Sequence, residues 1–136
     1  MKKLLLIKLL VVLVVASSNA MAEWTPIGEG ERRVSYIDLN TISKSGNLVK
    51  VWVMFDLKEA KSTEGITFLS SANQIEVDCK EELIHMLAMT AYSKNMAQGI
   101  ALKSIYDVHD EWHPVPPNSG ESNIWKIACG RLRLRK

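Results

Sequence analysis

The chain has 136 residues, 47% of them hydrophobic, and a formal net charge of +2 at pH 7. Three lysines lie within the first ten residues, and without them 14 Lys and Arg face 15 Asp and Glu, a net charge of −1. This balance excludes a strongly basic domain that attracts nucleic acid or anionic membrane through its overall field. The length fits a single domain.

The N-terminus is typical of an export signal. Lysines precede an apolar run at residues 9–16, which is too short to span a bilayer comfortably, and Ala20-Met21-Ala22 fits a cleavage box. We expect residues 1–22 to be a signal peptide cleaved after Ala22, with Ala20 as the alternative. An uncleaved membrane anchor is the competing interpretation. No cysteine follows the apolar run, so a lipid anchor is not supported, and we expect no transmembrane helix after cleavage.

The first half of the mature chain predicts strands separated by turns. We expect strands at residues 24–31, 34–38, 48–57 and 66–77, a turn-rich segment at 40–43, a hairpin turn at Gly46-Asn47 and a polar loop at 58–65. The strand at 48–57 is the clearest, because its odd-numbered residues from Val49 onward are all apolar. We expect that face to be core and Trp52, on the mixed face, to be half covered.

Residues 81–92 are ambiguous. They contain many good helix formers, which favour a helix by propensity. They also alternate in a way that suits a strand buried on both faces. A lone histidine in this segment, His85, is expected to be a satisfied core or edge histidine.

The C-terminal part predicts a turn, a strand, an extended loop and a helix. The turn falls at 93–99 and the strand at 100–106, and prolines keep residues 113–120 out of a helix. Ser119 or Ser122 caps a helix that runs to about Cys129 and stops at Gly130.

The chain has two cysteines, Cys79 and Cys129. In an exported protein an even number indicates a disulfide, and closing a loop of about fifty residues stabilises by roughly 4 kcal/mol. Two free thiols or an intermolecular bridge are the alternatives.

No residue pattern indicates catalysis. His109 and His113 lie four apart, which suits zinc on a helix, but Pro114 follows directly and a third strong ligand is not evident. We therefore expect a solvated polar loop, no metal, no cofactor and no enzymatic activity. A metal-dependent hydrolase using the two histidines is the alternative.

Two sequence features suit partner binding. The basic tail has candidate contact residues at Arg131, Arg133, Arg135 and Lys136, for a sulfated glycan, anionic lipid or acidic protein face. Its other interpretation is a terminal strand or a solvated end. The four tryptophans are expected mainly as core anchors, with an exposed partner contact as the alternative.

A series of anchor residues resembles the surface-adhesin protein E family of Gram-negative bacteria. The anchors are Trp24, Ser35-Tyr36-Ile37-Asp38, Val51-Trp52-Val53-Met54-Phe55-Asp56, Val77-Asp78-Cys79, Ala91-Tyr92-Ser93, Gly99, Trp112, Pro116-Pro117-Asn118-Ser119 and Ile127-Ala128-Cys129. The resemblance implies an α+β domain at residues 23–136, with a single antiparallel sheet of about six strands. It also implies a C-terminal helix tethered by Cys79–Cys129, and a strand at 81–92.

The family's named member is a surface adhesin that binds host matrix or serum proteins. The resemblance therefore implies an exported, non-enzymatic binding module that contacts host matrix or envelope proteins. Because the leader lacks a lipidation cysteine, we expect a periplasmic or secreted protein. The alternative is a periplasmic small-ligand-binding or envelope-structural protein. The sequence does not determine the oligomeric state.

Overall fold

A computed structural model describes residues 22–134. The expected leader lies outside these residues apart from Ala22, and so do Arg135 and Lys136. The elements are β1 (Thr25–Glu29), β2 (Arg33–Ser45), β3 (Leu48–Thr63), β4 (Ile66–Asp78), β5 (Leu83–Tyr92), β6 (Ala101–Ile105), β7 (His113–Pro114) and α2 (Gly120–Ala128). The domain is mostly sheet, so the expected α+β class holds only roughly.

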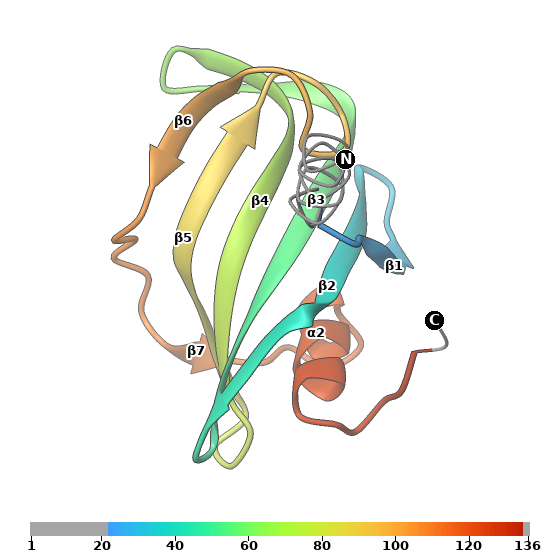
Figure 1. The fold of residues 1–136 in the computed structure, drawn as a ribbon, viewed down its shortest axis with the longest axis vertical. Helices are drawn as coiled ribbons and strands as arrows, with labels where there is room; N and C mark the ends of the chain where they lie inside the picture. The colour runs from blue at the N-terminus through green and yellow to red at the C-terminus, as the bar shows by residue number, and fades with distance from the viewer. Residues whose placement is uncertain (1–21, 135–136) are drawn as a thin grey trace, which may run out of the picture.

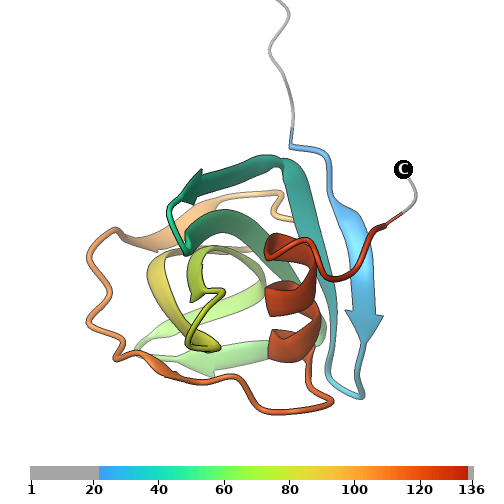
Figure 2. The same ribbon diagram turned by 90° about the horizontal axis from the view of Figure 1, so that it is seen from below.

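All strands belong to one antiparallel sheet whose spatial order follows the chain. The order is β1-β2-β3-β4-β5-β6, and the short β7 pairs with β5 below β6. Each strand is joined to its neighbour by a short connection, the simplest topology for antiparallel strands. The sheet curls strongly, and α2 packs inside the curl (Figures 1 and 2). The expected antiparallel sheet and C-terminal helix are confirmed.

Two of the expected turns were wrong, because the strands continue through them. β2 runs on to Ser45 through residues 40–43. Its pairing with β3 shifts register between Asp38 and Ser43, so residues 40–43 form an irregularity within the strand. There Asp38 accepts a hydrogen bond from the Asn40 amide, and the Thr41 hydroxyl accepts one from the Trp52 amide. Asp and Asn side chains that bond to nearby backbone amides are common in turns, so the residue types of this segment favoured a turn.

The expected polar loop at 58–65 is mostly strand as well. β3 continues to Thr63, and only Glu64 and Gly65, both with positive φ, form the turn into β4. Residues 58–63 are exposed, so this end of the strand has no buried face to produce an apolar alternation. The Gly46-Asn47 hairpin turn was predicted correctly, with φ 61° at Gly46.

Residues 83–92 of the ambiguous segment 81–92 are a strand, as the family resemblance implied, while residues 81 and 82 belong to the preceding turn. β5 pairs with β4 from Asp78↔Leu83 to Ser70↔Tyr92, and Ile84 and Ala88 are buried. Pairing and burial therefore override the helix propensity of the segment. A turn between β4 and β5 is fixed by Asp78, whose carboxylate accepts the amides of Lys80 and Glu81.

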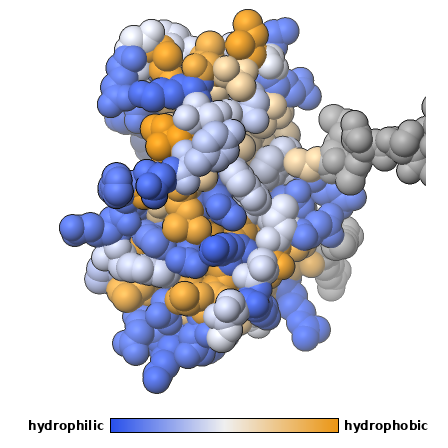
Figure 3. All heavy atoms as spheres, turned by 60° about the vertical axis from the view of Figure 1, so that its left-hand side comes forward, coloured by the Kyte–Doolittle hydropathy of each residue, from blue (hydrophilic) through white to orange (hydrophobic). Residues whose placement is uncertain are grey.

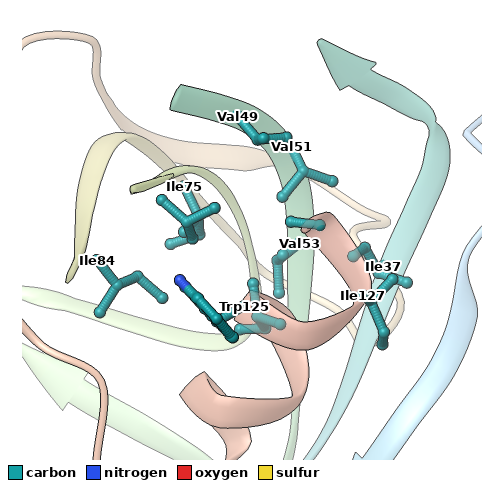
Figure 4. Close-up of a cluster of buried hydrophobic side chains, with 11 residues drawn as sticks. Ile37, Val49, Val51, Val53, Ile75, Ile84, Trp125 and Ile127 are labelled. Atoms are coloured by element: carbon teal, nitrogen blue, oxygen red, sulfur yellow. The ribbon is translucent and has the colours of Figure 1, made fainter. Parts of the chain in front are cut away.

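The core lies between the concave face of the sheet and α2 (Figure 4). Val49, Val51 and Val53 are at most 2% exposed, which confirms this part of the expected core face, while Phe55 and Leu57 are only half-buried. The buried cluster comprises Ile37, Val49, Val51, Val53, Ile75, Val77, Ile84, Ile124, Trp125, Ile127 and Ala128. On the other face of β3, Trp52 is half-buried as expected, while Met54 is fully buried.

The helix is fixed at both ends. Ser119 caps it by accepting the Ser122 amide, and Gly130 with φ 72° follows its C-terminus. Cys129 is bonded to Cys79, with the two Cα atoms 5.6 Å apart. The disulfide therefore ties the helix end to the end of β4, and the free-thiol and intermolecular alternatives do not hold in this structure.

Candidate functional site: an open sheet edge and its surroundings

The strand β6 forms one edge of the sheet. Among the described residues it pairs only with β5, through Met89↔Ile105 to Tyr92↔Ala101. Two large apolar side chains lie just beyond its ends, and both are well exposed: Ile100 at 69% and Tyr106 at 78%. An edge strand presents unpaired backbone groups that can pair with another chain. The edge and its two side chains together form a candidate interaction surface.

The face that carries β6 has a mixed surface. Figure 3 shows hydrophobic side chains in several patches, with hydrophilic side chains between them. Lys103 from β6 forms an ion pair with Glu64 across the sheet, with 2.7 Å between Nζ and Oε2. A surface on which apolar and polar side chains alternate is typical of a protein contact with a polar rim.

Ile100 and Tyr106 were not among the candidate binding residues expected from the sequence. Both were placed on the expected strand at 100–106, and nothing in the sequence showed which strand lies at an edge. The sequence indicated only that a strand lies here, between a turn and a proline-rich loop. The edge position itself depends on long-range pairing.

The basic tail folds back over the helix end and does not form a strand in the described residues. The amides of Arg131 and Leu132 donate to the Lys126 carbonyl oxygen, and Leu134 packs against the core. The Arg131 guanidinium lies 5.7 Å from the centre of the Trp125 ring. Arg131 and Arg133 are exposed, and Arg131 lies where a cation favours a helix C-terminus.

The tryptophans divide between core and surface. Trp125 is buried, Trp24 and Trp52 are half-buried, and Trp112 is 38% exposed. Trp125 is therefore the core anchor that the sequence led us to expect, and Trp112 is the one with most free surface. Trp112 stacks on His85, with ring centroids 3.7 Å apart.

The histidines do not gather into a metal site. No three His, Cys, Asp or Glu residues in the described part, 22–134, are placed to hold a metal ion. His113 bonds to Glu121 and His85 to Glu76, while His109 is exposed. Both ring nitrogens of His85 have hydrogen-bond partners, as expected of a satisfied histidine.

A second feature is a pair of hollows that meet at Arg33. The larger, of about 1240 Å³, lies along Gly30–Arg33 and residues 57–62. The smaller, of about 390 Å³, lies between β1 and the start of α2, with Ser35 and Asn123 in its lining. The Arg33 guanidinium stacks on Phe55, 3.8 Å from the ring centre. Partial burial lowers the pKa of Arg33, and the nearby Glu121 carboxylate opposes this.

The described residues 22–134 contain no helix that is both long and apolar enough to cross a membrane. The fold and the site define a small antiparallel-sheet domain in which a disulfide locks one helix into the concave face. The family model for surface-adhesin protein E matches residues 24–130, and the chain belongs to this family. The family is one of adhesin-type surface proteins.

Solved structures with the same fold come from Haemophilus influenzae. A crystal form of protein E matches with a TM-score of 0.56 at 14% identity, covering 82% of this chain and 97% of that one. A second protein E structure matches with a TM-score of 0.54 at 16% identity, covering 83% and 95%. Protein E from a non-typeable strain has a TM-score of 0.54 at 14% identity, covering 84% and 86%. Among curated proteins no significant match was found.

Proposed function

We propose that the mature domain is an exported, non-enzymatic binding protein that contacts a protein of the host matrix or of the bacterial envelope. Membership of the surface-adhesin protein E family supports this class. The observation that carries the proposal is the open edge of β6, flanked by exposed Ile100 and Tyr106. The same fold in Haemophilus protein E supports the architecture alone.

The edge can bind by adding a strand. An extended segment of the partner pairs its backbone with β6, and Ile100 and Tyr106 contact apolar side chains at the two ends of the pairing. Because β6 has only five residues, backbone pairing alone gives few hydrogen bonds. The two side chains therefore supply most of the discrimination, as large anchors do in protein interfaces.

The basic tail provides a second contact for an acidic surface. Arg131 and Arg133 are exposed, and Arg135 and Lys136 extend the series in the sequence. Attraction between exposed charges is weakened by salt, so the tail contribution falls as ionic strength rises. The contribution of Ile100 and Tyr106 does not depend on charge, so it persists as ionic strength rises.

The test is direct binding of the purified exported protein to immobilised matrix glycoproteins and to solubilised envelope proteins. The proposal expects saturable binding to at least one of them, weaker when residues 131–136 are deleted and weaker in high salt. A matched control is Lys44→Ser in the β2–β3 hairpin, which removes one exposed charge that is not part of the tail. Absence of saturable binding to every protein in both sets would contradict the proposal.

The alternative function is small-ligand binding in the periplasm, and the hollows at Arg33 favour it. Arg33 forms no ion pair with a carboxylate of residues 22–134, so its guanidinium has donors free for an anionic ligand. Protease added to intact cells separates the two functions. Cleavage of the domain favours the adhesin-type role, while protection together with loss of a ligand in Arg33→Ala favours the alternative.

A further inference from the structure

Residues 106–114, here called the strap, connect β6 to β7 and lie along the edge of β5 that β6 leaves uncovered. The Val108 amide donates to the Leu87 carbonyl oxygen at 3.1 Å, and the Asp110 carboxylate accepts the Met86 amide at 2.9 Å. β7 then pairs with Leu83 and Ile84. The strap therefore occupies backbone groups that would otherwise make β5 an open edge.

One histidine fastens the strap to the sheet. His85, on β5, has its Nε2 atom 2.8 Å from a carboxylate oxygen of Glu76 on β4. Its Nδ1 atom lies 3.2 Å from the backbone carbonyl oxygen of Asp110 in the strap. The ring stacks on Trp112, also in the strap, with an interplanar angle of 24°. The His85 and Glu76 side chains are each only 13% exposed, so water competes little with these contacts.

A second histidine fastens the strap to the helix. His113 lies at its β7 end, with Nδ1 3.2 Å from the Glu111 carbonyl oxygen. Its Nε2 atom lies 3.2 Å from a carboxylate oxygen of Glu121 in the first turn of α2. The backbone carbonyl of Glu111 raises the pKa of His113, partial burial opposes this, and the carboxylates of Glu121 and Asp110 raise it further.

The two rings share an uncommon arrangement. Each ring nitrogen faces a carbonyl or carboxylate oxygen, and neither of these groups has a hydrogen to donate. A neutral imidazole carries one N–H, so it can satisfy only one of its two acceptors, whereas the imidazolium carries two. The charged groups that raise the pKa of His113 are also anionic, namely the carboxylates of Glu121 and Asp110.

We propose that the strap is a pH-sensitive clasp, closed over the edge of β5 while His113 is an imidazolium and loosened when His113 loses a proton. The deprotonation leaves one of the two acceptors of His113 without a donor, at Glu111 or at Glu121. The proton goes to solvent, and no covalent bond changes. Loosening uncovers β5 between Leu83 and Ala88 as an additional pairing edge. This inference does not depend on the proposed function.

The test is amide hydrogen exchange of the purified exported protein at pH 5.5 and pH 8.0, with each rate corrected for the intrinsic effect of pH. The clasp predicts that protection of Met86 and Val108 falls about tenfold at the higher pH, relative to core amides such as Val51. Ring ¹⁵N shifts should show His113 doubly protonated at pH 5.5. Protection that is independent of pH in the wild type, or a neutral His113 ring at pH 5.5, would overturn the proposal.

A variant assigns the effect to His113. His113→Gln should reduce the pH response of Met86 and Val108. His109→Gln is the matched control, since His109 is in the same strap but exposed, and it should keep the wild-type response. If His113→Gln does not fold, the wild-type profile and the ring shifts of His113 still decide. An equal response in His113→Gln, His109→Gln and the wild type would overturn the assignment to this ring.

Discussion

The indole Nε1 atom of Trp125 donates a hydrogen bond to the backbone carbonyl oxygen of Asp78, at 2.9 Å. Asp78 is the last residue of β4, and the next residue, Cys79, is disulfide-bonded to Cys129. Asp78 therefore holds Trp125 and Cys79 holds Cys129. Trp125 and Cys129 are four residues, about one helical turn, apart. The helix that fills the concave face is positioned by a polar and a covalent contact at the same point.

The hydrogen bond from Trp125 should be measurable separately from its packing. Trp125→Phe keeps an aromatic ring in the core but leaves the Asp78 oxygen without its donor, and we expect it to lower the free energy of unfolding by about 1–3 kcal/mol. Urea unfolding measures this change. Lys126→Ala, an exposed neighbour on the same helix, should stay within about 0.5 kcal/mol. Equal stability of the Phe variant and the wild type would contradict the assigned role.

The disulfide closes a loop with a sequence separation of 50. Replacing Cys79 and Cys129 together by Ala should cost about 2–5 kcal/mol of unfolding free energy, because the unfolded chain regains the entropy that the bond removes. Thermal unfolding of the variant is compared with the wild type, with and without reductant. Reductant should lower the melting temperature of the wild type and leave the variant unchanged; a wild type insensitive to reduction counts against this prediction.

Two isoleucines differ in burial and provide a matched pair. Ile124, at 1% exposed, lies in the core under α2, and Ile124→Ala should cost about 2–5 kcal/mol through lost burial and a residual cavity. Ile100, at 69% exposed, should tolerate the same change within about 0.5 kcal/mol. The denaturant midpoints of the two variants, compared with that of the wild type, measure these losses. Comparable losses at both positions would show that the exposed side chain has a structural role.

His113 makes stability depend on pH in a defined direction. Its pKa is raised in the folded state, so the imidazolium is favoured by folding and the stabilisation is complete below the unfolded value of about 6.5. The contribution is lost as pH rises through the folded pKa. Comparing urea unfolding of the wild type and Glu121→Gln across this range tests the direction. The variant should lose less stability on raising pH, and a steeper loss would refute the pairing.

The sequence predicted the parts of the fold that depend on local alternation and on turn chemistry. The apolar face that begins at Val49, the glycine turn at Gly46 and the helix cap at Ser119 all leave short-range signals. Ile84 and its neighbours do not, because a strand buried on both faces and a helix can share one composition. Pairing with β4 settles that segment, and only the family resemblance anticipated it.

The features missed by sequence reasoning are those created by long-range placement. The exposure of Tyr106 follows from β6 being an edge, which depends on the whole strand order. The contacts of His85 join β4, β5 and the strap, with Glu76 and Asp110 separated from it by 9 and 25 residues. Periodicity within a segment carries no information on such contacts.

The edge of β6 is proposed to bind a protein partner through Ile100 and Tyr106. The binding isotherm of the Ile100→Ser, Tyr106→Ser double variant, measured against the matrix or envelope protein that the wild type binds, tests this, with Lys44→Ser alongside. We expect binding to be weakened about tenfold or more in the double variant, with its unfolding free energy unchanged and Lys44→Ser like the wild type. Equal affinity of the double variant and the wild type would contradict it.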